Sequence, residues 1–406
     1  MAGLYIHIPF CESRCIYCGF YSTTSLALRD SYTAALCQEM QLRKDCLQEP
    51  ISTVYLGGGT PSQLSSQQLQ KIFQSVGLLV SQCETNSARP RDFQSPNVRQ
   101  TDSPVWSGKE VTIECNPDDV TEEFASQLAQ LPVNRVSMGA QTFSDERLRF
   151  LHRRHTAEEV RLAVVRLRKA GIRNISIDLM FGFPGERLAD WEQDIRQALD
   201  LQVEHISAYS LMIEEGTPLH RLVQQGKIQE IDEELSLQMY NRLIDLLTEA
   251  GYEHYEISNF ARPGYRSRHN SSYWQEVPYL GIGAAAHSYT RQQQADGSLL
   301  CTRSWNVADI RQYIQAISEG RLPSESETLD LKTRYNDLIT TALRTCDGIN
   351  LDKMQKEFGD SLFQEMMKEA AAKIKNGLMK IDHQHLSLTR RGLFISDDIM
   401  SDFIQL

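Results

Sequence analysis

Several features are missing from this sequence of 406 residues, and each absence narrows the class of protein. No apolar run approaches the roughly 20 residues that a membrane-spanning helix needs. The N-terminus has no basic segment followed by an apolar one, so we expect no secretory signal. Positive charge is scarce, because 42 Lys and Arg against 53 Asp and Glu give a formal net charge of −11. An acidic chain is not attracted to phosphate backbones, so we expect no nucleic-acid partner.

Cysteine is present, but its pattern does not fit a disulfide framework. The nine cysteines are odd in number and irregularly spaced, and three of them lie within eight positions: Cys11, Cys15 and Cys18. We expect a cytoplasmic chain, because thiols stay reduced in that compartment. The six scattered cysteines are predicted to be small apolar or surface residues, whereas the crowded three need another explanation.

Short apolar strands alternate with amphipathic helices over the first half of the chain. Strands are predicted at residues 4–8, 53–56, 111–114, 135–138, 175–180 and 205–211. Helices are expected between them, at residues 26–47, 62–80, 121–131, 157–170 and 188–201. This alternation predicts an α/β fold with a parallel sheet, which right-handed crossovers curl into a partial (β/α)6 barrel. In such a barrel the chemistry lies at the C-terminal ends of the strands.

Two segments interrupt this alternation and suggest how the chain is divided. Residues 82–109 are polar and rich in Ser and Pro, which predicts a long, disordered surface insertion. Residues 285–298 suggest a link between domains. We therefore predict a barrel domain over residues 1–290 and a smaller, mostly helical and winged-helix-like domain over residues 291–406. Its elements are helices at 309–319, 331–344, 351–358 and 361–376, and a hairpin at 378–389.

The crowded cysteines have the spacing Cys11-x3-Cys15-x2-Cys18, directly after the first predicted strand. Three thiolates this close can ligate three irons of a 4Fe–4S cluster and leave the fourth iron open to a small molecule. Zinc is the main competitor, in which case the chain would be a zinc-stabilised interaction protein. Structural zinc prefers four ligands in paired spacings, and no second Cys or His pair with such a spacing lies nearby.

Glycine-rich and polar motifs follow the other predicted strands. GGGTP at residues 57–61 lets the backbone approach a ligand closely. Glu114, Gln141 and Asp178 end the third, fourth and fifth strands. A structural hydrogen bond explains each of these side chains as well as a ligand contact does, but their shared position favours one binding site.

These motifs resemble those of known proteins. The cysteine motif, with Tyr17 before its last cysteine, resembles the radical S-adenosylmethionine superfamily. YIHIPFC, GGGTP, IECNP, SMGAQTF, LHRRHT, DLMFGFPG and SAYSL resemble the family of oxygen-independent coproporphyrinogen III oxidase over most of residues 4–290. The helical tail is similar to that family's C-terminal domain. The resemblance implies a cluster-bound S-adenosylmethionine that contacts Tyr5, Gly58 and Glu114. Positions that face a second S-adenosylmethionine in the oxidase match Tyr17, Gly59, Thr60, Gln141, Arg153 and Asp178.

Two departures separate the chain from the oxidase. The oxidase carries a fourth cysteine two places after the third, where this chain has Phe20, and it has an N-terminal extension before the cysteine motif. Both differences resemble the related HemW-type haem chaperones. Residues 269–274, HNSSYW, also match an HNxxYW motif associated with haem in that group. Neutral imidazole is a good haem ligand, so His269 is the expected one. The alternative is a turn whose aromatic side chains fill the barrel base.

The resemblance implies a haem chaperone that passes haem to haem-dependent proteins, including membrane respiratory enzymes. The alternative is the oxidase itself, which decarboxylates propionate side chains by a radical mechanism. The residues needed to cleave S-adenosylmethionine are retained, so the sequence leaves open whether the chain is an enzyme. It also leaves open the electron donor and whether the chain forms a homodimer.

Overall fold

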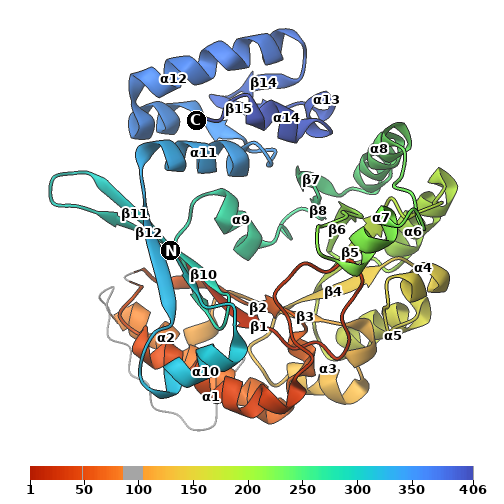
Figure 1. The fold of residues 1–406 in the computed structure, drawn as a ribbon, viewed down its shortest axis with the longest axis vertical. Coiled ribbons are helices and arrows are strands. Elements are labelled where there is room, and N and C mark those ends of the chain that lie inside the picture. Colours follow the sequence, from red (N-terminus) through yellow and green to blue (C-terminus); the bar gives the residue numbers. More distant parts are fainter. Residues whose placement is uncertain (48, 86–103, 406) are drawn as a thin grey trace.

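Parallel strands form the middle of the computed structural model, which describes residues 1–47, 49–85 and 104–405 (Figure 1). The six predicted strands are confirmed, within a few residues of their expected ends, as parallel neighbours in one sheet. They are β1 (Ala2–Ile8), β2 (Ile51–Gly58), β3 (Glu110–Cys115), β4 (Arg135–Gln141), β5 (Asn174–Phe181) and β6 (His205–Ser210). Their carboxyl ends meet at one edge, which is where the polar motifs were predicted to gather.

Additional strands extend this sheet on both sides. β9 (Tyr279–Ile282) lies parallel to β1, and the antiparallel strands β10 (His287–Gln293), β11 (Leu299–Asn306) and β12 (Ser324–Leu329) follow it outward. The other edge ends in β8 (Asn259–Ala261) and β7 (Glu253–Glu256). The order β12-β11-β10-β9-β1-β2-β3-β4-β5-β6-β8-β7 has two ends, so the sheet is a partial barrel, as predicted.

Helices connect the parallel strands and lie along the outer side of the sheet (Figure 1). They are α1 (Arg29–Leu42), α2 (Ser66–Thr85), α3 (Glu122–Leu128), α4 (Asp145–Phe150), α5 (Ala157–Lys169) and α6 (Leu188–Asp200), with α7 (Pro218–Gln224) and α8 (Glu233–Glu249) after β6. In α5, Thr156 and Glu159 form a capping box at the first turn. Apolar residues at helical spacing then face the core: Val160, Ala163, Val164 and Leu167. Among the described residues, no helix combines the length and apolarity needed to cross a membrane.

The predicted link at residues 285–298 is wrong, because these residues form β10 and the turn toward β11. The predicted boundary between residues 290 and 291 therefore falls inside a strand of the main sheet. Helix α10 (Ile310–Ser318) also packs into the main hydrophobic core, through Tyr313 and Ile317. A separate hydrophobic core begins only at Tyr335, after β12. Hydrogen bonding across the sheet thus keeps the segment before Tyr335 with the barrel.

The C-terminal unit is mostly helical, with a small antiparallel sheet. Its helices are α11 (Leu331–Ala342), α12 (Leu351–Lys375), α13 (Arg390–Leu393) and α14 (Ser396–Ser401), and its strands are β13 (Ile349–Asn350), β14 (Met379–Asp382) and β15 (His385–Leu388). Gly359 has φ 83° and interrupts α12, so the two helices predicted on either side of it are confirmed. The predicted hairpin is β14–β15.

The flanks of the predicted insertion at 82–109 are ordered structure. Helix α2 continues to Thr85, and Val105 and Trp106 are buried against the main core. The loop prediction is wrong for these flanks, because buried Cys83 extends the apolar face of α2 and Trp106 packs against Phe73 of the same helix. Residues 86–103 lie outside the described residues.

A buried carboxylate joins distant parts of the barrel. Glu39 of α1 is fully buried and accepts hydrogen bonds from Arg43 Nε (2.7 Å), Gly283 N (2.8 Å), Asn306 Nδ2 (2.8 Å) and Tyr313 Oη (2.6 Å). Its partners come from α1, the loop after β9, β11 and α10. This network explains why the segment that follows β9 packs with the N-terminal helices.

We expect Glu39→Ala to destabilise the protein strongly, because the change leaves the buried charge of Arg43 without its carboxylate partner. Breaking a buried ion pair by removing one partner costs about 3–5 kcal/mol. Denaturant unfolding should show this loss, while Glu325→Ala on the exposed edge strand β12 should leave the midpoint unchanged. Equal stability of the two variants would contradict the role assigned to Glu39.

Candidate functional site

A cavity of about 440 Å³ opens at the C-terminal ends of the parallel strands. All three crowded cysteines line it, together with residues from β2, β3, β4, β5 and β6. The predicted site residues that share this cavity are Cys11, Cys15, Cys18, Tyr17, Gly58, Gly59, Thr60, Glu114, Gln141, Arg153 and Asp178. The fold therefore brings the strand-end motifs together at one cavity, as predicted.

The cysteines lie in the segment that follows β1, residues 9–23, here called the cysteine loop. Ile16 anchors the middle of this loop, because its N–H donates to Leu151 O (3.3 Å) and its carbonyl accepts from Leu219 N (3.0 Å). The Ile16 side chain is buried in a small apolar cluster with Leu151 and Leu219. The loop is therefore held on both sides, by the end of α4 and the start of α7.

The glycine motif holds the cysteine loop from the β2 side. Gly59 N donates to Ile8 O (2.8 Å), and Thr60 N donates to Phe10 O (2.7 Å). A Cβ atom on Gly59 would lie 2.8 Å from Phe10 O and 2.9 Å from Ile8 O. Only glycine therefore allows the two backbones to approach this closely. Thr60 Oγ1 also lies 3.6 Å from Cys11 Sγ.

Glu114 is a half-buried carboxylate at the end of β3. Its two oxygens accept hydrogen bonds from Tyr55 Oη (2.7 Å) and Gly58 N (3.0 Å). Burial raises the pKa of Glu114 to about 7, although these two hydrogen bonds oppose the shift. A Cβ atom on Gly57 would lie 2.8 Å from Glu114 Oε1, so this glycine also makes room for the carboxylate.

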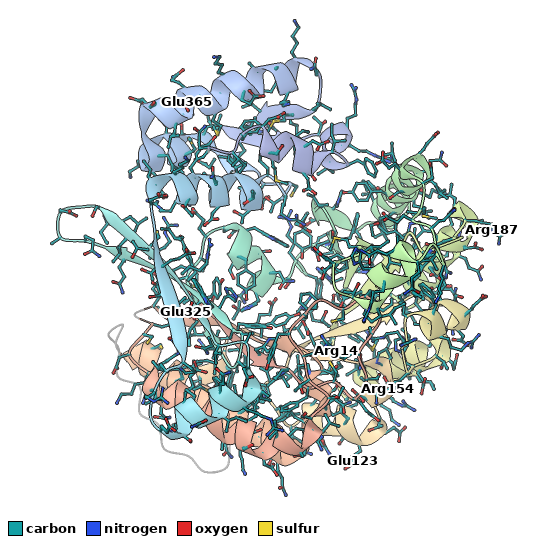
Figure 2. The ribbon with its side chains drawn as sticks, in the orientation of Figure 1. Arg14, Glu123, Arg154, Arg187, Glu325 and Glu365 are labelled. Atoms are coloured by element: carbon teal, nitrogen blue, oxygen red, sulfur yellow. The ribbon has the colours of Figure 1, made fainter. Side chains whose placement is uncertain are left out.

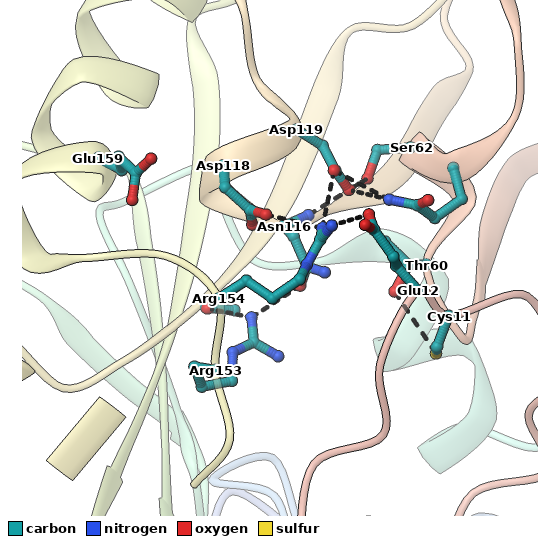
Figure 3. A network of polar contacts seen from close by, with 12 residues as sticks. Cys11, Glu12, Thr60, Ser62, Asn116, Asp118, Asp119, Arg153, Arg154 and Glu159 are labelled. Atoms are coloured by element: carbon teal, nitrogen blue, oxygen red, sulfur yellow. Dashed lines mark hydrogen bonds and ion pairs between the residues drawn. The ribbon is translucent and has the colours of Figure 1, made fainter. Parts of the chain in front are cut away.

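Two adjacent arginines connect the cysteine loop to the ends of β3 and β4 (Figure 3). Arg153 Nη2 donates to Asn116 Oδ1 (2.7 Å) and Gly139 O (2.8 Å), and its Nη1 donates to Cys15 Sγ (3.5 Å). Arg154 pairs instead with carboxylates: Glu12, Asp118 (2.7 Å) and Asp119 (2.9 Å). Arg153 Nε has no hydrogen-bond partner among the described residues, so this guanidinium can still receive a ligand acceptor in the cavity.

Gln141 and Asp178 line the cavity from the ends of β4 and β5. Gln141 has φ 65°, an uncommon conformation for a residue other than glycine, and it follows a register shift in β4. Such backbone strain is concentrated at functional sites. Burial raises the pKa of Asp178 to about 6, and the nearby Arg135 charge opposes this shift.

Arg135 is a site residue that the sequence reasoning missed. It begins β4, is 1% exposed and lines the cavity, and its Nε and Nη1 have no hydrogen-bond partner among the described residues. Its charge lowers the pKa of Glu114 and Asp178, whereas burial raises both. The available signal was a charged residue at the start of an otherwise apolar strand, since buried arginine is rare unless it is paired.

Two predicted ligand residues, Tyr5 and His269, do not line the cavity. Tyr5 Oη is hydrogen-bonded to His7 Nδ1 (2.9 Å). His269 lies in α9 (Arg268–Trp274), is 1% exposed, and has both ring nitrogens hydrogen-bonded, Nδ1 to Thr53 Oγ1 and Nε2 to Tyr273 Oη, each at 2.8 Å. Burial lowers the pKa of His269 to about 3, so the imidazole is neutral. Both ring nitrogens therefore already have side-chain partners, and His269 as the haem ligand stays a prediction.

Helix α9 closes the end of the barrel opposite the cysteine loop. The N–H groups of Arg268 and His269 donate to Glu110, the first residue of β3, at 3.0 and 2.9 Å. Gly3 of β1 lies against the same imidazole, because a Cβ atom there would be 3.3 Å from its Cε1. The HNSSYW segment therefore lies at the barrel base, in a helix and not in a turn, and its histidine bonds to side chains.

The three cysteine thiols fit a cluster in which each thiolate binds a different iron atom. The three thiols line one cavity at the end of an anchored loop. Within residues 1–47, 49–85 and 104–405, no three His, Cys, Asp or Glu side chains converge on a single point as ligands of one ion do. A cubane cluster does not require that convergence, because each thiolate binds a different iron atom.

Comparison with known proteins shows the relatives of this chain. Sequence models of two families match it, the radical SAM superfamily over residues 5–198 and the HemN C-terminal domain over residues 329–395. Heme chaperone HemW of Bacillus subtilis is 33% identical, over 100% of this chain and 99% of that protein. Heme chaperone HemW of Lactococcus lactis is 31% identical, over 98% and 96%.

A mitochondrial relative and a solved structure extend this comparison. The mitochondrial radical S-adenosyl methionine domain-containing protein 1 of Bos taurus is 30% identical, over 98% of this chain and 86% of that protein. The structure of coproporphyrinogen III oxidase HemN from Escherichia coli superposes with a TM-score of 0.76 at 22% identity. The superposition covers 99% of this chain and 89% of the oxidase, and it shows the shared fold.

We expect Gly59→Ala to lower the iron and acid-labile sulfide bound per chain by more than half, because the added methyl group collides with backbone atoms of the cysteine loop. Gly77→Ala is a matched control, since its Cβ would meet only Trp106 Cζ2 at an ordinary 3.6 Å. Both variants are to be reconstituted anaerobically beside the unaltered protein. Full iron and sulfide content in Gly59→Ala would show that this close approach is not needed.

Proposed function

We propose a haem-chaperone function for this chain, which belongs to the HemW family of the radical S-adenosylmethionine superfamily. In this proposal the chain binds a 4Fe–4S cluster, S-adenosylmethionine and haem, and it delivers haem to haem-dependent proteins. The observation that carries it is the single cavity in which three thiols, a glycine-lined backbone and the half-buried Glu114 carboxylate meet. The full-length similarity to proteins named heme chaperone HemW supports the proposed binding and delivery of haem.

The cavity residues support a cluster and S-adenosylmethionine in distinct ways. Cys11, Cys15 and Cys18 would hold the cluster, whose open iron supplies a binding point for S-adenosylmethionine and an electron for its cleavage. Glu114 would accept the ribose hydroxyls. Gly58 N–H already donates to Glu114, so the contribution of Gly58 is to orient that carboxylate. The contact from Tyr5 has less support, because the Tyr5 hydroxyl is bonded to His7.

A second S-adenosylmethionine remains a prediction of the resemblance. The residues assigned to it all line the cavity: Tyr17, Gly59, Thr60, Gln141, Arg153 and Asp178. Arg153 and Arg135 carry buried guanidinium nitrogens without partners among the described residues, which suits a ligand that bears a carboxylate.

The proposal extends to location and partners. The nine cysteines are all free, as expected of a chain in the cytoplasm. The proposed recipients are haem-accepting proteins, including membrane respiratory enzymes. A homodimer is the proposed assembly. No nucleic-acid partner is proposed for a chain of net charge −11.

The alternative function, decarboxylation of coproporphyrinogen III, is favoured by the shared fold of the HemN structure. Phe20 argues against it, because the oxidase motif has a fourth cysteine at that position. In this structure Phe20 is 72% exposed at the cavity rim, where it presents an apolar ring in place of a thiol.

The affinity for S-adenosylmethionine should rise by about tenfold between pH 6 and pH 8. Burial raises the pKa of Glu114 to about 7, so the carboxylate gains its charge across this interval and then accepts the ribose hydroxyls more strongly. Binding is measured anaerobically on cluster-loaded protein. Glu114→Gln should bind weakly at both pH values, while Glu123→Gln, exposed on α3, should behave like the unaltered protein. An affinity that does not change with pH would remove Glu114 from the ribose site.

The haem-chaperone proposal is tested with the reconstituted full chain under anaerobic conditions. We expect it to bind haem and to transfer it to an apo haem protein, with no protoporphyrinogen formed from coproporphyrinogen III. Sustained decarboxylation would establish the alternative function. Absence of haem binding at any cluster loading would refute the chaperone function.

A further inference from the structure

The geometry of His269 leaves the haem of the proposed function without its expected ligand, and the following inference rests on that function. His269 is enclosed at the barrel base by Thr53 and Tyr273. The C-terminal unit packs over the same end of the barrel, where Cys346 N donates to Tyr255 O (3.0 Å). Haem would have to displace these contacts to reach the imidazole. The opposite end of the barrel, at the cysteine loop, needs no such displacement.

The rim of the cavity exposes three large apolar side chains together. Phe20 is 72% exposed, Met212 66% and Tyr209 40%, and all three line the cavity. Phe20 belongs to the cysteine loop, and Met212 follows β6. These two segments touch, because Gly19 lies against the Glu214 carboxylate. Exposed apolar groups gathered around one opening mark a binding surface for an apolar ligand.

The same rim offers a metal ligand of the right chemistry. His152 follows α4, is exposed and lines the cavity. Its ring makes no hydrogen bond or ion pair with the residues that the structure describes, so both nitrogens are available. Its φ of 59° is unusual and turns the chain between Leu151 and Arg153, both of which are tied to the cysteine loop. Neutral imidazole is the commonest protein ligand of haem iron.

The charges at the rim suit the carboxylates of haem. Arg14 and Arg154 lie in the middle of the molecule in Figure 2, and both line the cavity. Arg154 is already paired with Asp118 and Asp119. Arg14 makes no ion pair within the described residues, so its guanidinium can receive a propionate.

We propose that haem binds at this rim, with His152 as axial ligand, its macrocycle against Phe20 and Met212, and a propionate at Arg14. The site would then adjoin the cluster, because Arg14 lies within the cysteine motif and Phe20 two residues beyond it. Because the cluster would be held by cysteines of the same loop, loading it should also strengthen haem binding.

The test is an anaerobic haem titration of the cluster-loaded full chain, followed by its absorption spectrum. His152→Asn keeps a residue that tolerates positive φ and removes the imidazole, so affinity should fall at least tenfold and the Soret band should shift. His383→Asn is the matched control, an exposed histidine with φ 43° in the β14–β15 hairpin, and it should change neither readout. Phe20→Ser should weaken binding without shifting the band.

A second pair of measurements tests the contact between a propionate and Arg14, and the role of His269 at the base of the barrel. Haem dimethyl ester should bind more weakly than haem to the unaltered chain, and Arg14→Gln should abolish that difference. His269→Gln should lower thermal stability while leaving the haem spectrum unchanged.

Two outcomes separate this inference from the function on which it rests. If the unaltered chain binds no haem, the proposed function fails and the site with it. If the chain binds haem normally in His152→Asn but loses the spectrum in a folded His269→Gln, only the rim site is wrong.

Discussion

Two backbone hydrogen bonds set the geometry on which the rest of the site depends. Gly59 donates to Ile8 and Thr60 donates to Phe10, so the end of β2 lies directly against the start of the cysteine loop. The contact requires glycine, because a Cβ atom on Gly59 would overlap backbone atoms that cannot move independently of the sheet. The three thiols of the cysteine loop take their position from this approach and from the anchor at Ile16.

The two ends of the partial barrel differ in how their polar groups are hydrogen-bonded. At the C-terminal strand ends, Arg153 bonds to Cys15, and partially exposed thiols and unpartnered guanidinium nitrogens face a cavity. At the opposite end, α9 is bonded to the barrel through Glu110 and Thr53, and only its Asn270 lines the cavity among the residues described for this helix. Polar groups without a hydrogen-bond partner thus lie where a ligand can enter. Hydrogen-bonded polar groups lie at the end where the C-terminal unit attaches.

Inside the barrel, the buried cation Arg135 lies near two half-buried carboxylates. Burial raises the pKa of Glu114 to about 7 and of Asp178 to about 6, and the charge of Arg135 opposes both shifts. The buried histidines of the base, His205 and His269, are kept neutral, because burial lowers the pKa of each. The net charge around the cavity therefore depends on Arg135, Glu114 and Asp178. A charged ligand would change the protonation of the two carboxylates.

The sequence by itself determined the parallel strands, the cysteine motif and the family, because hydrophobic period and residue spacing are local properties of the chain. It placed Glu114, Gln141 and Asp178 at strand ends, and parallel pairing alone brings such ends together. It misplaced the domain boundary, since Glu39 bonds to Asn306 and Tyr313 across more than half the chain. Only the tertiary structure decided that His269 faces Thr53 and Tyr273 and that Arg135 reaches the cavity. The direction and hydrogen-bond partners of a buried polar side chain depend on contacts between distant segments, which no local pattern records.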